Sequence, residues 1–118
     1  MPRARKKLDR IRQVHSWMQS RFRTPHPTVL RFVSPEASEG SLGFVELHRG
    51  KLRISLLKTC THQHLQDLLI HEYSHAMDWS HHRAPRPDHG PHFGVCYSEV
   101  YRAYIDEGGW KESYECKW

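Results

Sequence analysis

The first half of this chain shows two periodicities of hydrophobic and polar residues, and they predict different elements. Over residues 6–21, apolar side chains recur at steps of three and four, which is typical of an amphipathic helix. Further along, three stretches are β-branched or alternate between apolar and polar, which predicts strands. These strands span residues 28–33, 42–48 and 51–57. The last two are separated by Arg49-Gly50, a tight turn, so we expect a small, mostly antiparallel sheet with one hairpin.

Between the first two strands, residues 34–40 are rich in turn-forming side chains and are expected to form a loop. Helical periodicity then returns. Thr61 is typical of an N-cap, and the helix after it is predicted to run to about Ser80. Its apolar side chains form two arcs on different sides, so we expect this central helix to be buried on both.

A polar loop over residues 81–90 separates this helix from another. Pro91 suits the first turn of the following helix, and Gly108-Gly109 ends it. Its apolar stripe consists of Phe93, Cys96, Tyr97, Val100, Tyr101, Tyr104 and Ile105. Strands followed by helices in this order predict an α+β fold.

The 118 residues suit one domain with a modest core. No apolar run approaches the ~20 residues of a membrane span, and no apolar segment follows the basic N-terminus. We therefore expect a cytoplasmic protein that does not contact membranes. The three cysteines are widely spaced and include no C-x-x-C pair, which argues against a disulfide framework or a cysteine zinc finger.

The net charge of +5 is unevenly distributed. Residues 1–31 carry nine Lys/Arg and one acid, giving +8, whereas residues 32–118 carry nine Lys/Arg and twelve acids, giving −3. A basic N-terminal segment favours a polyanionic partner, and we expect weak DNA binding without sequence preference. The residues expected to contact phosphates are Arg3, Arg5, Lys6, Lys7, Arg10 and Arg12. The alternative is a solvated basic helix.

Candidate chemistry lies in residues 68–77, which contain the pattern H-E-x-x-H within the predicted central helix. Residues four apart share a helix face, so His71 and His75 can reach one metal ion. Glu72 lies about 60° from His75 around the helix axis, close enough to hold a water molecule on that metal. This layout is typical of zinc hydrolases, in which the carboxylate takes the proton of that water. The alternative is a surface helix with two histidines, but burying such polar groups without a partner is costly.

A catalytic zinc usually has three protein ligands and one water. The candidates for the third are Asp78, His81, His82, Asp88, His89, His92 and Glu99. His89 is favoured because it lies where a loop enters a helix. There Gly90 lets the backbone turn sharply, and Pro91 starts the helix. His92, one turn further on, is the nearest rival.

Other residues are assigned supporting roles. Asp67 and Asp78 are predicted to accept a hydrogen bond from an imidazole N–H of the site, the alternative being helix-surface charge. An oxyanion formed during hydrolysis needs a donor besides the metal. The sequence leaves six candidates open: Tyr73, Tyr97, Tyr101, Tyr104, His82 and His92. The substrate backbone is expected to add to an exposed strand of the hairpin.

Two motifs together, His71-Glu72-x-x-His75 and His89-Gly90-Pro91-x-Phe93, resemble the core of the SprT-like metallopeptidases, the group that includes Spartan. The strand ending in Arg53-Ile54-Ser55-Leu56-Leu57 is also similar, and the resemblance covers roughly residues 40–106. It implies a compact zincin core of the minigluzincin type, with His89 as third zinc ligand and Glu72 as catalytic base. It also implies endoproteolysis of proteins bound or crosslinked to DNA, and a nuclear location if the source is eukaryotic.

We accordingly expect one SprT-like domain of four segments. They are a basic amphipathic helix (1–27), a small sheet (28–58), the zinc-binding helices (59–107) and a tail (108–118). One zinc per chain is expected, because the tail carries Cys116 without the other ligands of the zinc ribbon that many relatives possess. The alternative function is a DNA-associated or regulatory binding module with a structural zinc. Glu72 favours the enzyme, because a structural site has no use for a carboxylate beside the metal.

Overall fold

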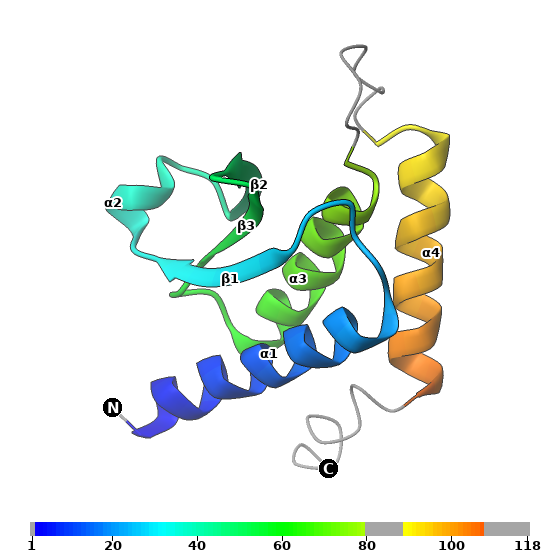
Figure 1. The fold of residues 1–118 in the computed structure, drawn as a ribbon. Helices are drawn as coiled ribbons and strands as arrows, with labels where there is room; N and C mark the ends of the chain where they lie inside the picture. The colour runs from blue at the N-terminus through cyan, green and yellow to red at the C-terminus, as the bar shows by residue number, and fades with distance from the viewer. Residues whose placement is uncertain (1, 80–88, 108–118) are drawn as a thin grey trace.

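The computed structural model describes residues 2–79 and 89–107, and the side chains from residue 5 onwards. Figure 1 shows an α+β arrangement in which helix α3 lies centrally, with the sheet on one side and helix α4 on the other. The elements, in order, are α1 (Pro2–Arg21), β1 (Thr28–Val33), α2 (Pro35–Ser38), β2 (Gly43–His48), β3 (Lys51–Leu57), α3 (His62–Met77) and α4 (Pro91–Asp106).

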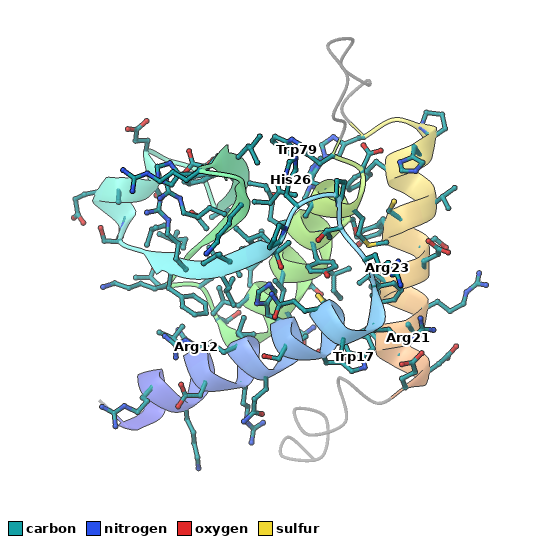
Figure 2. The ribbon with its side chains drawn as sticks, viewed as in Figure 1. Arg12, Trp17, Arg21, Arg23, His26 and Trp79 are labelled. Atoms are coloured by element: carbon teal, nitrogen blue, oxygen red, sulfur yellow. The ribbon has the colours of Figure 1, made fainter. Side chains whose placement is uncertain are left out.

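The N-terminal helix is longer than its apolar pattern indicated. It begins at Pro2 rather than near residue 6, because proline is well suited to a first helical turn and that turn buries no periodic apolar residue. Ile11 and Met18 are fully buried. Figure 2 shows Trp17 and Arg21 near the C-terminal end of α4, where the Arg21 guanidinium binds the Glu107 carboxylate at 2.7 Å.

The sheet is mixed, which corrects the expectation of a mostly antiparallel one. Its strand order is β1-β3-β2, so the last strand lies in the middle. It pairs in parallel with β1, Thr28 opposite Leu52, and antiparallel with β2, Gly43 opposite Leu56. The pattern of one strand cannot show which partner it takes, so only the hairpin was predictable. Its turn at Arg49-Gly50 has positive φ at both residues, as a type I′ turn requires.

The segment between β1 and β2 also differs from the expected loop, because it contains the short helix α2. Ser34 caps this helix by accepting a hydrogen bond from the Ala37 N–H at 3.3 Å. Four helical residues bury too little apolar surface to leave a periodic signal, which is why the sequence showed only turn formers here.

The core lies where α1, β3 and α3 meet. Ile54 and Leu56 of the central strand belong to the same core cluster as the fully buried Leu65 and Leu69 of α3. Burying each such side chain contributes about 1.5–3 kcal/mol. The expected burial of α3 on two sides is therefore confirmed, and this fixes the rotation of the helix about its axis.

Helix α4 packs against α3 along only part of its apolar stripe. Its buried residues are Phe93, Cys96, Val100, Ala103 and Tyr104. Tyr97, Tyr101 and Ile105, which the sequence placed in the same stripe, remain considerably exposed. Cys60 and Cys96 are free thiols. Among the described residues, no helix is both long and apolar enough to cross a membrane.

Candidate metal centre

The candidate site is built on the C-terminal half of α3. This helix begins where predicted, because the Thr61 hydroxyl accepts a hydrogen bond from the His64 N–H at 3.2 Å. It ends at Met77 rather than near residue 80, with Asp78 as its C-cap. His71 and His75 are half-buried on one face, one helical turn apart.

Three imidazole nitrogens converge at this face. The Nε2 atoms of His71 and His75 lie 3.2 Å apart, and Nε2 of His89 lies 3.1 Å from each of them. Each nitrogen of a neutral imidazole is either a donor or an acceptor. Among three nitrogens in mutual contact, at least two must therefore have the same role, and those two cannot hydrogen-bond to each other. A cation accepting all three lone pairs removes that conflict. Tetrahedral zinc with ligands at 2.0–2.1 Å separates their nitrogens by about 3.3 Å, close to the observed triangle.

His89 reaches the site through an unusual backbone conformation. Its φ of 58° lies in the left-handed region, whereas Gly90 is extended with φ −78° and caps α4. The sharp turn expected at the glycine is therefore made by the histidine, and this corrects the sequence interpretation. Left-handed residues other than glycine cost of order 1 kcal/mol or more and concentrate at functional sites. Pro91 does start the helix, as predicted.

The other candidate ligands that the structure describes lie elsewhere. Among the described residues, the cluster of ligand atoms close enough to share one metal ion consists of His71, His75 and His89. His92 Nδ1 contacts the Asp78 carboxylate instead. Glu99 is exposed on α4. His81, His82 and Asp88 lie outside the described residues.

Glu72 is buried beside the three histidines, with 6% of its surface exposed. It forms one wall of a pocket of about 360 Å³ between α3 and the edge strand β2. The pocket is lined by Gly43, Phe44, Val45, His71, Glu72, His75, Trp79 and His89. A Cβ added at Gly43 would lie 3.4 Å from Glu72 Cγ and 3.2 Å from Leu56 Cδ2. The strand thus lies against the Glu72 side chain because residue 43 has no side chain.

Phe93 packs against all three histidines. Its ring centroid lies 4.4 Å from that of His75, 4.9 Å from His89 and 5.3 Å from His71. Phe93 was predicted as a core residue and as part of a motif, but its contact with the histidines was not. Trp79, labelled in Figure 2, and Gly43 were likewise missed. Only the spacing of Phe93 from His89, one helical turn, carried any signal.

The two aspartates assigned to support the histidines occupy different surroundings. Asp78 contacts an imidazole, but the one of His92. Asp67 is exposed on α3. Burial, and then the charge of Asp67, raise the pKa of the Tyr104 hydroxyl above its usual value. Hydrogen bonds donated by a histidine of the cluster to either aspartate remain predictions.

The candidates for an oxyanion donor are separated by the fold. The buried Tyr73 hydroxyl lies 2.8 Å from the Phe22 carbonyl and 3.2 Å from that of Met18, so it serves the core. Burial raises its pKa to about 12. Tyr104 is also buried in the core. Tyr97 lies closer to the site, with its ring 6.3 Å from that of His71 and edge-on to it.

The basic residues expected to contact nucleic acid lie in the first three turns of α1. Lys7 donates hydrogen bonds to the carbonyls of Cys60 at 2.8 Å and Lys58 at 3.1 Å. Arg12, labelled in Figure 2, pairs with Asp9 at 2.7 Å and stacks over the Phe32 ring. The other four are Arg3, whose side chain is not described, Arg5 and Lys6, which are exposed, and Arg10, which is half-buried.

Comparison with protein-family models found no match, and comparisons with curated proteins and with solved structures found none either. The site is therefore interpreted from its own geometry.

Proposed function

We propose that this protein is a zinc-dependent endopeptidase. The observation that carries the proposal is the triangle of Nε2 atoms, 3.1–3.2 Å on each side, beside the buried carboxylate of Glu72. Three imidazole donors suit zinc, which takes such ligands in catalytic sites and leaves one position for water or substrate. When bound, zinc supplies a Lewis acid and lowers the pKa of its water towards about 7.

Glu72 is the general base in this proposal. Its carboxylate accepts a proton from the attacking water and then transfers it to the nitrogen of the leaving amine. Burial against Gly43 restrains the side chain on the pocket wall, where it can act without a large rearrangement. Phe93 packs beneath the three histidines, restricting their ring orientations and limiting the access of water.

The polypeptide substrate adds to the edge strand β2. The Leu57 N–H donates to the Leu42 carbonyl, so in this antiparallel ladder residues 44, 46 and 48 turn their backbone groups towards β3. Gly43 and Val45 consequently point theirs outward, and both line the pocket with the histidines. An extended substrate hydrogen-bonded to these two residues would pass directly over Glu72.

The resemblance to SprT-like peptidases extends the proposal to substrates bound or crosslinked to DNA. The basic residues of α1 support this extension, because Arg5 and Lys6 are exposed cations on one end of the molecule. A binding module with a purely structural zinc is less well supported. Structural sites are usually closed by four protein ligands, whereas the described residues bring three together beside a pocket.

Glu72→Gln provides the test. The amide keeps the size and hydrogen bonding of the side chain but cannot accept a proton, so the variant should retain zinc and fold. Proteolysis should fall by about 10²–10⁴-fold. Zinc content is measured by mass spectrometry, and cleavage is measured on an unfolded protein substrate. Equal cleavage rates in wild type and variant would refute the role of Glu72, and absence of zinc from the wild type would refute the metal assignment.

A further inference from the structure

One face of α4 carries large side chains that do not enter the core. Tyr97, Tyr101 and Ile105 follow one another at four-residue steps and therefore share a helix face. Their exposed fractions are 37%, 44% and 43%. Val100 and Tyr104 of the same helix are buried, so the core contact of α4 is already made by other residues. A contiguous exposed apolar row on a small domain is typical of an interaction surface.

This row borders a shallow, open surface groove of about 460 Å³. We call it the α4 groove, and it is lined by Tyr97, Ser98, Tyr101, Arg102, Ile105 and Asp106. Tyrosines combine a large apolar ring with a hydroxyl donor, and they are frequent at the centres of protein interfaces. Arg102 and Asp106 add one cation and one anion, both able to hydrogen-bond a peptide backbone.

The α4 groove is continuous with the histidine cluster through packed rings. Phe93 lies 4.4 Å from the His75 ring and stacks on Tyr97 at 5.9 Å with an interplanar angle of 16°. Tyr97 in turn lies 6.0 Å from Tyr101. Tyr97 also meets the edge of the His71 ring. The histidines that line the proposed active site therefore form part of the same aromatic row.

We propose that the α4 groove binds a segment of the polypeptide substrate remote from the scissile bond and favours aromatic and aliphatic side chains there. This inference rests on the proposed function. The charges of Arg102 and Asp106 cancel, and Glu107 is paired with Arg21, so Glu99 leaves α4 with a net negative charge. A polyanion is therefore disfavoured on this helix, whereas an apolar polypeptide of low charge is well matched.

The dimensions set a length requirement for the substrate. From Phe93 to Ile105 the helix rises about 18 Å, at 1.5 Å per residue. An extended chain covers that distance in about five or six residues. A peptide that ends at the pocket near Glu72 cannot occupy the α4 groove. A longer one can, and it gains binding without any change in the chemistry at the cleaved bond.

Tyr101→Ala tests this inference, because Tyr101 lies two turns beyond Phe93 and contacts none of the three histidines through its ring. Val95→Ala is the matched control. Val95 is an exposed apolar residue of α4, 58% accessible, and it does not line the groove. The probe is an unfolded, uncharged peptide of about 20 residues containing Leu and Phe, together with successively shortened forms. Binding is measured by fluorescence anisotropy in the Glu72→Gln background, and cleavage is measured in the otherwise wild-type protein.

Tyr101→Ala should raise both the Kd and the KM for the long peptide by about tenfold, and the loss should shrink as the peptide is shortened. Val95→Ala should behave as wild type. An unchanged Kd and KM in Tyr101→Ala, or an equal loss in Val95→Ala, would overturn the proposal. So would a dimer, or an oligonucleotide complex, that the tyrosine substitution abolishes. If the peptide binds through Tyr101 but the wild type never cleaves it, the α4 groove stands and the peptidase assignment fails.

Discussion

At the scale of single residues, the position of His89 decides whether the site is complete. The H-E-x-x-H pair is local, but the third nitrogen belongs to a residue 14 positions after His75, with a left-handed backbone. His92, three residues further on, was the nearest rival and instead contacts Asp78. Removing His89 and removing His92 should therefore have opposite effects on zinc binding.

We expect His89→Ala to lose most of the bound zinc and His92→Ala to retain it. An alanine at residue 89 removes one of the three Nε2 atoms, leaving two imidazoles that hold zinc far more weakly. Metal content after gel filtration, determined by mass spectrometry, measures the outcome. Full zinc in His89→Ala together with loss in His92→Ala would reverse the assignment.

At the scale of elements, a glycine in strand β2 permits the strand to approach Glu72 of helix α3. We expect Gly43→Ala to reduce proteolysis and to destabilise the fold by about 1 kcal/mol, the low end for overpacking. The new methyl group must displace Leu56 Cδ2, 3.2 Å away, and fills the space beside Glu72 Cγ at 3.4 Å. Gly94→Ala is the matched control. A Cβ there meets nothing within 4 Å, and alanine is the better helix former by about 1 kcal/mol.

Urea unfolding and cleavage assays on both glycine variants measure these effects. Gly94→Ala should be as active as the wild type and slightly more stable. If Gly43→Ala retains full activity and stability, the close approach of β2 to Glu72 is not needed, and the proposed substrate strand loses its main support.

The basic residues of helix α1 lie in two different environments. Lys7 binds the carbonyls of Lys58 and Cys60, just before α3, whereas Arg5 and Lys6 are exposed. If α1 binds DNA, the double variant Arg5→Ser/Lys6→Ser should bind duplex DNA with a weaker dependence on salt. The slope of log K against log salt concentration should become shallower by about 0.9 for each lost phosphate contact. Scrambled DNA sequences should bind alike, since the expected contacts are to phosphates.

Lys7→Met serves as the comparison for this DNA prediction. It should lower the free energy of unfolding, through loss of two charge-assisted hydrogen bonds, more than it changes the salt slope. Fluorescence anisotropy over a salt series and urea unfolding separate the two effects. DNA binding that is independent of salt, or unchanged in Arg5→Ser/Lys6→Ser, would leave α1 as a solvated basic helix.

At the scale of the whole molecule, His15 couples the fold to pH. It is buried where α1 packs on β1, with Nε2 2.9 Å from the Thr28 hydroxyl. Burial lowers its pKa from 6.5 to about 4. The unfolded chain therefore takes up a proton more readily than the folded one between these values. Stability from this group is complete above pH 6.5 and is lost as the pH falls towards 4.

We expect the wild type to lose about 3 kcal/mol of unfolding free energy from His15 on going from pH 7 to pH 4. In His15→Gln this component should be absent, because the amide does not titrate and can still bond to Thr28. Urea unfolding at several pH values, with a chelator present so that metal binding does not contribute, measures the difference. Identical pH profiles in the two proteins would exclude His15 as the source.

Features set by neighbouring residues could be predicted from the sequence, whereas features set by contacts between distant residues could not. The three strands, the cap at Thr61 and the start of α4 at Pro91 lie within a residue of their predicted places, because turn and cap chemistry is local. The parallel pairing of β1 with β3 was not predicted. The exposure of Tyr97 and Tyr101 was not predicted either, because the same periodicity describes a buried face and an exposed one.

The sequence by itself determined the positions of the strands and the approximate positions of the three long helices. It also determined that His71, Glu72 and His75 lie on adjacent faces of one helix, since a helical repeat depends only on neighbouring residues. Only the tertiary structure decided that Nε2 of His89 meets the other two histidines, that Gly43 lies against Glu72, and that His15 is buried. Each of these depends on contacts between residues distant in the chain. Such contacts form when whole elements pack to bury their apolar faces, and no local pattern of residues records which faces will meet.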